Sequence, residues 1–306
     1  MIIPGKSYRG EPPPLTESEE ASSERMRQVV AYLAENIGER NTACPVNLVK
    51  SEAYITRRFE ELGYDIRLET YSAEGKNVSN IEVALVGHEK PDDIIVVGAH
   101  YDSAPGTPGA DDNASAVAVL LELARHYREY RSKRTIRFVA FVNEEPPFSF
   151  TDLMGSHVYA HGCRQRKEKI SGMLCLESMG YFSTAPGSQK YPPPLEKLYP
   201  DTGDFIVFCS NIASYPLLRR CVKQFRKTTR FPSEGLVAPE KLVAPISWSD
   251  HWAFWQMGYQ AIMVTDTAFL RNPHYHLPSD TKEHLDYQRM ARVTEGLKLV
   301  IEKLVD

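Results

Sequence analysis

The sequence predicts an α/β fold in which helices cover both faces of a largely parallel sheet. Two segments, "DDIIVVGAH" (92–100) and "TIRFVAFVN" (135–143), are almost continuously apolar, as is typical of strands that are buried on both faces. The segment between them, 113–130, has a strongly apolar face and is predicted to be a helix. A strand–helix–strand order of this kind is the crossover unit from which parallel sheets are built.

The chain before this unit is predicted to contain an extended arm, two helices and two strands. Residues 1–15 are rich in proline and form the arm. Apolar residues recur at helical spacing over 16–40, and acidic residues near its start suit the dipole of a helix. A second helix is predicted over 46–62, ending at Gly63, a residue type that commonly follows a helix. Two strand-like segments come next, at 64–72 and 78–87.

The chain after the crossover unit continues the mixture of helices and strands. The predicted helices cover 152–168, 213–227, 249–257 and 286–304, and the predicted strands cover 170–178, 204–209 and 260–265. The proline-rich segment 181–203 is predicted to be an irregular insertion, and loops of this length tend to be functional or mobile. Since no internal repeat or linker divides the chain, we expect the arm to be followed by a single domain over 16–306.

Composition excludes several classes of protein. The 306 residues are 42% hydrophobic and 25% charged, with a net charge of −4, which argues against a nucleic-acid or anionic-membrane partner. No apolar run approaches the ~20 residues needed to cross a bilayer. We expect a cytoplasmic protein as the sequence stands, or a periplasmic or secreted one if a signal peptide has been removed. The five cysteines form no CxxC pair and are interpreted as small buried apolar residues.

Imidazole and carboxylate side chains recur where predicted strands end, which is where ligands bind in open α/β sheets. None of the 36 Lys and Arg residues lies between Pro91 and Arg125, so carboxylates there need another compensating cation. Each residue alone has an ordinary explanation, such as a helix N-cap for two adjacent aspartates. Together they predict a metal site. The candidates are His100, Asp102, Asp111, Asp112, Glu144, Glu145, Glu177, Asp266, His274 and His276.

Mixed histidine and carboxylate ligation suits Zn²⁺. Two such ions ~3.5–4 Å apart need a bridging carboxylate, and together they can activate water and polarise a carbonyl group. Of the adjacent Glu144 and Glu145, one can bind metal while the other stays free to take a proton. Asp102, two residues after His100, is well placed to orient that imidazole.

Six motifs give the chain a family resemblance. In order they are "GAHYDS", "GADDNAS", "NEE", "LESMGY", "SDHWAFW" and "YHLPSDT". They resemble the zinc aminopeptidase family, which also contains glutaminyl cyclases and the inactive ectodomain of transferrin receptor. The resemblance covers about 25–304. It implies a three-layer α/β/α fold, with a mixed, mostly parallel, twisted sheet of about eight strands and a two-zinc site over the strand ends.

The resemblance also implies roles for individual residues. One zinc ion would be held by His100 and Glu177 and the other by Glu145 and His276, with Asp112 as the bridge. Glu144 would be the general base, Asp102 the partner of His100, and Tyr275 a stabiliser of the oxyanion. Many family members have aspartate at the position of Glu177, whose longer side chain should still reach the ion. Family members often have a cis peptide bond after the bridging aspartate, here Asp112–Asn113.

The function implied by these residues is hydrolysis of the N-terminal bond of a peptide whose amino group is free. A glutaminyl cyclase, typically with one zinc ion and no activated water, is the alternative among enzymes. Retention of both His100 and Glu177 favours two metal ions, and Tyr275 stands where cyclases tend to have tryptophan. An inactive binding module would lack ligands or Glu144. The walls of the pocket for the substrate's side chain are expected to come from the insertion and from 148–156 and 247–255. In these last two segments Phe148, Phe150, Trp252 and Trp255 would make the pocket apolar, although they could equally be core residues.

Overall fold

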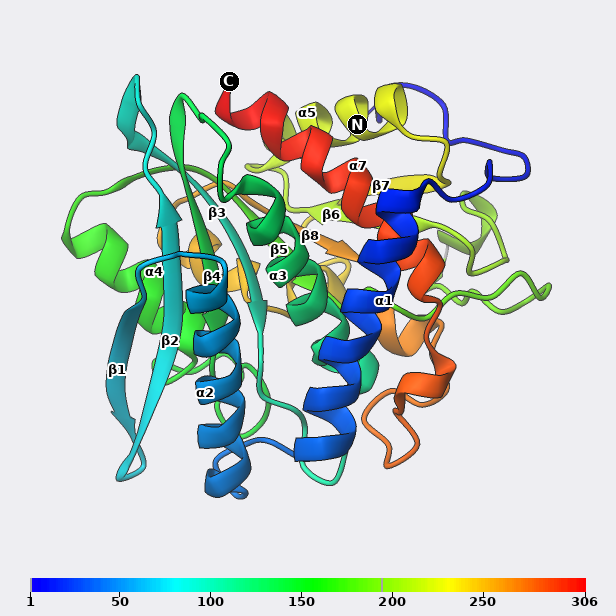
Figure 1. Cartoon of the computed structure of the whole chain (residues 1–306). Coiled ribbons are helices and arrows are strands. Elements are labelled where there is room, and N and C mark those ends of the chain that lie inside the picture. The colour runs from blue at the N-terminus through cyan, green and yellow to red at the C-terminus, as the bar shows by residue number, and fades with distance from the viewer. Residues whose placement is uncertain (1, 194) are drawn as a thin grey trace.

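The computed structural model describes residues 2–193 and 195–306, and its eight strands form one mixed sheet (Figure 1). The strand order is β1-β2-β4-β3-β5-β8-β6-β7. The pairs joining β4, β3, β5 and β8 are parallel, whereas β1 and β2 on one side and β6 on the other attach antiparallel. The bounds are β1 (Arg67–Ala73), β2 (Lys76–Leu85), β3 (Lys90–His100), β4 (Arg134–Phe141), β5 (Lys169–Glu177), β6 (Ile206–Ser210), β7 (Ser233–Val237) and β8 (Ala261–Thr265).

Helices cover both faces of this sheet, which confirms the predicted three-layer fold. Figure 1 shows α1, α2, α3 and α7 in front of the sheet. These helices and α5 share one apolar core with the sheet, and the shorter α4 and α6 share a second core on the other face. None of the helices in the described ranges is long and apolar enough to span a membrane. Their bounds are α1 (Glu17–Ala31), α2 (Pro45–Glu61), α3 (Ala116–Tyr127), α4 (Gly155–Gln165), α5 (Tyr215–Thr228), α6 (His251–Gln256) and α7 (Tyr287–Val305).

The central strands are mainly apolar over their buried parts because each contributes to both cores. In β3, Ile95 and Val97 pack on the side of α3, whereas Ile94 and Val96 pack on the side of α4 and α6. Successive side chains of a strand point to opposite faces, so a strand covered on both sides has no solvated position. Gly98 is required by close packing, since a Cβ atom there would lie 2.3 Å from the Phe141 ring.

Helix α1 begins as the sequence predicts but ends earlier. The Thr16 hydroxyl accepts a hydrogen bond from the Glu19 N–H at 3.2 Å, and the Glu19 carboxylate accepts one from the Thr16 N–H at 2.8 Å, which together form a capping box. The α-helix ends at Ala31, and one π-helical segment, Tyr32–Ile37, carries the chain to Gly38. The prediction of a single helix to residue 40 was therefore wrong in its last third. At the end of α2, Gly63 has φ +84°, as expected of a residue that terminates a helix.

Strand β7 was not predicted from the sequence. Its segment "SEGLV" carries few of the residues typical of strands, and it lies at the edge of the sheet. The N-terminal arm passes over this edge: the Ser233 N–H donates to the Ser7 hydroxyl at 2.9 Å, and Ile3 packs against Gly235. The Tyr215 hydroxyl also donates to the Ile2 carbonyl at 2.8 Å. These contacts tie the arm to both α5 and β7.

The insertion at 181–203 is irregular, as expected, and it contacts two neighbouring elements. Its described residues contain a short 3₁₀ turn, Leu195–Lys197, and an isolated bridge between Ser183 and Gly203. The Tyr199 hydroxyl donates to the Gly235 carbonyl of β7 at 2.9 Å, and the Lys190 N–H donates to the Leu270 carbonyl at 2.9 Å. The insertion thus joins the edge of the sheet to the loop that follows β8.

Candidate metal and catalytic site

The parallel strands place the predicted site residues at one edge of the sheet. His100 is the last residue of β3 and Glu177 the last of β5, while Glu144 and Glu145 follow the end of β4. His276 lies in the loop after β8. Because β4, β3, β5 and β8 are neighbours that run in the same direction, their carboxyl ends meet over a small area. The structure therefore brings His100, Asp112, Glu145, Glu177 and His276 together.

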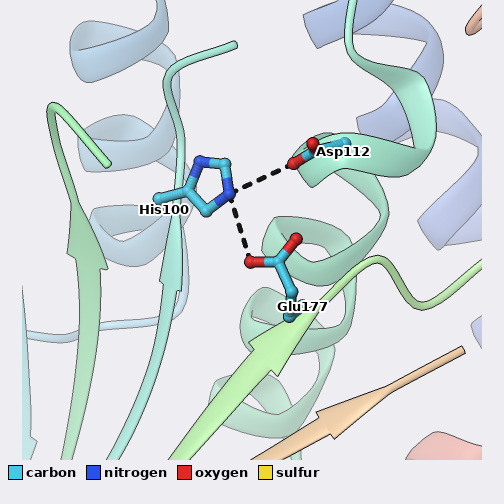
Figure 2. A group of neighbouring side chains, drawn as sticks. All are labelled: His100, Asp112 and Glu177. Atoms are coloured by element: carbon cyan, nitrogen blue, oxygen red, sulfur yellow. Dashed lines mark ion pairs between the residues drawn. The ribbon is translucent and has the colours of Figure 1, made fainter. Parts of the chain in front are cut away.

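The first group consists of His100, Asp112 and Glu177, all buried (Figure 2). The His100 Nε2 atom lies 3.2 Å from Asp112 Oδ1 and 3.3 Å from Glu177 Oε2. Figure 2 shows the imidazole facing both carboxylates, with Asp112 arriving from the segment that leads into α3. One nitrogen and two carboxylate oxygens thus surround a common point, as ligands of a metal ion do.

The second group consists of Asp112, Glu145 and His276. The His276 Nε2 atom lies 2.9 Å from Asp112 Oδ2 and 3.1 Å from Glu145 Oε1. Asp112 belongs to both groups and offers a different oxygen to each, Oδ1 to His100 and Oδ2 to His276. This is the arrangement expected of a carboxylate that bridges two ions.

The backbone around Asp112 departs from regular helix so that its side chain can face both groups. Within the π-helical segment Ala110–Ser115, Asp112 has φ −105° and ψ 93°, and the Asp112–Asn113 peptide bond is cis. The cis bond agrees with the family resemblance. The Asp280 carboxylate accepts hydrogen bonds from the N–H of Asp111 at 3.0 Å and of Asp112 at 3.2 Å. Asp280, which sequence reasoning did not single out, therefore fixes this backbone.

A buried arginine that the sequence did not indicate supports the same region. Arg40 is fully buried, and its guanidinium donates to the carbonyls of Tyr101 and Gly109, each at 2.7 Å. Burial lowers the pKa of Arg40 to about 10, opposed by the charge of Asp102. A cationic side chain therefore lies near these residues, although the stretch 92–124 itself contains no Lys or Arg. Arg40 donates to carbonyl groups, however, and leaves the carboxylates of the two groups free.

Asp102 connects the first group to the turn after β4. Its Oδ1 atom lies 3.5 Å from His100 Nδ1, whose ring also contacts the Asp102 carbonyl at 3.2 Å. The two carboxylate oxygens accept hydrogen bonds from the N–H groups of Glu144 at 3.2 Å and Glu145 at 3.1 Å. Asp102 therefore positions both an imidazole and the pair of glutamates.

Glu144 and Glu145 have different surroundings although they are adjacent. Glu145 belongs to the second group, and burial together with the charge of Asp112 raises its pKa to about 7. Glu144 belongs to neither group: its Oε2 atom lies 3.8 Å from His100 Nε2. Burial raises the pKa of Glu144 well above its ordinary value. A partly buried carboxyl group beside the two groups, yet outside both, has the position required of a proton acceptor.

Glu177 is held by hydroxyl groups. Its Oε2 atom accepts a hydrogen bond from the Ser249 hydroxyl at 2.7 Å, and its Oε1 atom accepts one from the Ser178 hydroxyl at 3.1 Å. Ser249 belongs to the motif that leads into α6. These bonds hold Glu177 Oε2 at 3.3 Å from His100 Nε2.

Tyr275 stacks on its neighbour His276, with ring centroids 3.9 Å apart. Burial, followed by the charge of Asp112, raises the pKa of Tyr275, so its hydroxyl keeps its proton and can donate. The other three candidates lie outside both groups. The Asp111 carboxylate accepts from the Gly180 N–H at 2.9 Å, that of Asp266 accepts from the Tyr181 N–H at 2.7 Å, and His274 contacts the Ser279 hydroxyl at 2.9 Å.

The two groups fit a pair of cations. Asp112 Oδ1 and Glu145 Oε1 are buried and have no hydrogen-bond partner among the described residues. Unsatisfied buried oxygens are costly unless a cation or a donor meets them. Burial tends to lower the pKa of His276, but the Asp112 carboxylate, which its ring contacts at 2.9 Å, and the neighbouring Glu145 carboxylate outweigh this effect and raise it to about 10. In the metal-free protein, protons thus occupy positions that cations can take.

An apolar cavity lies beside this site. Its volume is about 830 Å³, including the open space at its mouth. Its lining includes Glu177 and Tyr275, together with residues of the insertion, of β6, β7 and β8, of the segment 243–248 and of the loop after β8. Two of the expected wall segments therefore contribute, 181–203 and Trp248 of 247–255. The four aromatic residues proposed as walls do not line it. Phe148 and Trp255 are core residues, and Trp252 stacks edge-to-face on Phe150.

The chain is similar in sequence to several known proteins. The chain is 40% identical over 286 residues to a protein described as "Uncharacterized protein YfbL" of Escherichia coli (strain K12), covering 90% of this chain and 87% of that one. It is also 40% identical over 229 residues to aminopeptidase YwaD of Bacillus subtilis (strain 168), covering 72% of this chain but 44% of that one.

Solved structures share the fold. A zinc aminopeptidase from Bacillus subtilis superimposes with a TM-score of 0.72 at 16% identity, covering 93% of this chain and 95% of that one. A glutaminyl cyclase from Fimbriiglobus ruber does so with a TM-score of 0.66 at 20% identity, covering 96% and 97%. Residues 80–301 match the family described as peptidase family M28. That match includes the strand ends that carry both candidate ligand groups, and the chain belongs to peptidase family M28.

Proposed function

We propose that this protein is a two-zinc aminopeptidase. The observation that carries the proposal is the position of Asp112, whose two oxygens face His100 at 3.2 Å and His276 at 2.9 Å. A single carboxylate shared by two complete ligand groups is the feature that a two-metal hydrolase needs. The aminopeptidase activity named for the Bacillus subtilis relative supports the same reaction.

Zinc is the metal that suits these ligands. Imidazole nitrogen and carboxylate oxygen are common zinc donors, and several relatives about 35% identical over part of this chain are described as probable zinc metalloproteases. One ion would be held by His100, Asp112 and Glu177, and the other by Asp112, Glu145 and His276. When bound, such a pair supplies a water of lowered pKa and polarises the substrate carbonyl.

Glu144 would act as the general base. Its carboxylate takes a proton from the attacking water and then gives that proton to the departing amine, so its own charge is restored at the end of each cycle. Its N–H is fixed by Asp102 at 3.2 Å, which holds it beside the ligands without making it one. General bases placed in this way typically contribute 10²–10⁴ in rate.

Tyr275 and the acidic side chains would complete the site. The Tyr275 hydroxyl, which stays protonated, would donate a hydrogen bond to the oxyanion that forms from the scissile carbonyl. The free amino group of the substrate is a cation and needs an acidic partner, which Glu144 and the metal-site carboxylates provide. This requirement restricts cleavage to the first peptide bond.

A glutaminyl cyclase is the second candidate, because structural neighbours with that name share the fold. In that reaction the substrate's own amine attacks and an activated water has no role. The complete first group, in which His100 faces both Asp112 and Glu177, supports two ions and therefore hydrolysis.

The test is a pair of peptides of identical sequence, one with a free and one with an acetylated N-terminus, incubated with the zinc-loaded protein. We expect release of the first residue from the free peptide alone. The Glu144→Gln variant should keep its bound zinc and lose 10²–10⁴ of the rate. Cleavage of the acetylated peptide, or a Glu144→Gln variant as active as the wild type, would contradict the proposal. An inactive binding module would cleave neither peptide.

A further inference from the structure

We propose that the outer face of α5, together with the start of the N-terminal arm, binds an anionic membrane surface. Such a surface would decide where the protein works, and its existence does not depend on the reaction at the two ligand groups. Three features support it: an uneven distribution of charge, two exposed isoleucines beside the basic residues, and the position of α5 in the sheet.

The net charge of −4 is not spread evenly along the chain. The segment 205–233 contains six Lys or Arg residues and no Asp or Glu, which leaves 30 Lys and Arg against 40 Asp and Glu in the rest of the chain. One of the six, Arg226, is half-buried and pairs with Glu234 at 3.2 Å. The other five are exposed and pair with no carboxylate among the described residues: Arg219, Arg220, Lys223, Lys227 and Arg230. The average over the whole chain therefore hides one strongly basic face, which attracts anionic partners.

The exposed cations form a row on α5. The apolar residues of this helix pack into the core that it shares with the sheet, so its basic side faces outwards. Tyr215, Arg219, Lys223 and Lys227 follow one another at four-residue spacing, which places them one above the other on a helix. At 1.5 Å per residue, the row is roughly 18 Å long. Basic rows of this kind are attracted to the headgroups of anionic lipids.

Two exposed isoleucines lie at the beginning of the row. The side chains of Ile2 and Ile212 are 84% and 53% exposed. Both residues are bound to Tyr215, whose N–H donates to the Ile212 carbonyl at 3.2 Å and whose hydroxyl donates to the Ile2 carbonyl at 2.8 Å. Apolar side chains beside a basic row can enter the boundary between headgroups and acyl chains. The phosphates of a nucleic acid would pair with the cations but leave both isoleucines in water, so a membrane is the partner that uses the whole surface.

The N-terminal arm is fastened beside this row and adds to its charge. The Arg226 guanidinium donates to the carbonyls of Pro4 at 3.3 Å and Gly5 at 3.1 Å. Lys6 and Arg9 follow directly in the arm, and both are exposed. They line one groove together with Arg226. The arm thus brings two further cations and Ile2 to the same side of the molecule as α5.

Helix α5 begins at the edge of the sheet that is remote from the ligand groups. Strands β6 and β8 are antiparallel, and Val207, near the start of β6, pairs with Thr265, the last residue of β8. Strand β6 therefore ends, and α5 begins, at the opposite edge from the strand ends that carry His100 and Glu177. Figure 1 shows α5 along the upper margin of the molecule. A membrane bound there would leave the ligand groups open to water and to peptides.

The test is sedimentation of the zinc-loaded protein with vesicles of phosphatidylcholine alone and with vesicles that also contain about 30% of the anionic lipid phosphatidylglycerol. One variant removes three charges from the row, by Arg219→Gln, Lys223→Gln and Lys227→Gln. Its matched control removes three exposed charges from α2, from the loop after α3 and from α4, by Lys50→Gln, Arg131→Gln and Arg164→Gln. A third variant combines Ile2→Ser with Ile212→Ser. Circular dichroism checks that each variant is folded.

We expect the wild type to bind the anionic vesicles and to leave the neutral ones in the pellet without protein. Raising the salt from about 0.05 M to about 0.5 M should weaken binding by tenfold or more, because salt screens exposed charges. Each Lys or Arg near an anionic membrane surface is worth about fivefold in affinity, so the α5 variant should bind about 100-fold more weakly. The control variant should stay within about threefold of the wild type. The isoleucine variant should lose about tenfold, since it removes apolar side chains that enter the membrane.

Equal binding of the wild type to both kinds of vesicle, or binding to neither, would overturn the inference. So would an α5 variant that binds as its matched control does. A DNA duplex and poly-glutamate, measured at the same salt, test the other anionic partners. Tighter binding to either than to the anionic vesicles would assign the basic face to a nucleic acid or to an acidic protein and would overturn its assignment to a membrane. The comparison of the two kinds of vesicle with the wild type tests the inference even if a variant does not fold.

Discussion

The Asp112 Oδ2 atom lies 2.9 Å from His276 Nε2, although the two residues are 164 positions apart in the chain. The other oxygen of the same carboxylate faces His100. Two segments that are far apart in the sequence are thus joined through one side chain. The Asp280 carboxylate strengthens this junction, because it comes from the loop after His276 and accepts from the N–H of Asp112 at 3.2 Å. The site therefore depends on contacts between segments that are far apart in the chain.

Replacement of Asp112 by asparagine should disable both metal-binding groups at once. The amide keeps the size of the side chain but offers one neutral oxygen in place of two charged ones. We expect fewer than two zinc ions per chain after gel filtration, and a loss of activity greater than the ~10–100-fold that follows from loss of an outer partner of a ligand. Metal analysis of Asp152→Asn, whose side chain is 97% exposed, serves as the control. Two bound ions in Asp112→Asn would contradict a bridging role.

Replacement of Asp102 by asparagine should weaken the site without removing a ligand. Both Asp102 oxygens accept backbone N–H groups, from Glu144 and Glu145, and an amide group would turn a donor towards one of them. We expect zinc affinity or activity to fall by about 10–100-fold. Titration of the metal-free protein with zinc measures the affinity, and Asp65→Asn, an exposed site, should match the wild type. An unchanged affinity and rate would show that Asp102 positions nothing.

Arg40 should stabilise the fold as well as the site. The Arg40→Met variant keeps the buried apolar volume but removes the donors that meet the carbonyls of Tyr101 and Gly109. Since each hydrogen bond to a charged group contributes about 1.5–3 kcal/mol, we expect the free energy of unfolding to fall by roughly 3 kcal/mol. Urea denaturation with a chelator present measures this without metal. Arg57→Met, at a side chain 57% exposed, should change it by less than about 0.5 kcal/mol; equal effects of the two variants would contradict the role of Arg40.

Much of this architecture follows from local patterns in the sequence. The apolar runs of β3 and β4 indicate a sheet covered on both faces, and the residues directly after those strands indicate where a site must lie. Other contributions leave no local signal. Arg40 acts through carbonyl groups of residues 101 and 109, and nothing near position 40 indicates that contact. Strand β7 contains serine, glutamate and glycine and gains its place by pairing with β6 and by contact with the arm.

The walls of the cavity were the part of the site that was hardest to predict from the sequence. The four aromatic residues expected there, Phe148, Phe150, Trp252 and Trp255, lie elsewhere because aromatic character alone does not distinguish a core position from a pocket wall. The cavity is built where the insertion returns to the sheet, a long-range arrangement that no short motif encodes.

His251 should make the stability of the protein depend on pH. It is fully buried, its Nε2 atom contacts the Ile246 carbonyl at 2.7 Å, and burial lowers its pKa to about 4. The unfolded chain binds a proton at this residue below about pH 6.5, whereas the folded protein does not until about pH 4. Stability is therefore lost as the pH falls through this window, by about 2 kcal/mol between pH 6.5 and 5.

The His251→Gln variant isolates this contribution. Its free energy of unfolding, measured by urea denaturation with a chelator, should fall by about 2 kcal/mol less than that of the wild type over the same window. The exposed His284 provides the control, since His284→Gln should follow the wild type. Parallel pH curves for His251→Gln and the wild type would mean that His251 is not kept neutral by burial.

The most direct test of the two-zinc aminopeptidase assignment uses one zinc-loaded sample and one unblocked peptide that begins with glutamine, followed by mass spectrometry. Under our proposal the products are free glutamine and the peptide shortened by one residue, because water attacks the first peptide bond. Loss of ammonia alone, with the peptide otherwise intact, would show attack by the substrate's own amine and would contradict the assignment in favour of a cyclase.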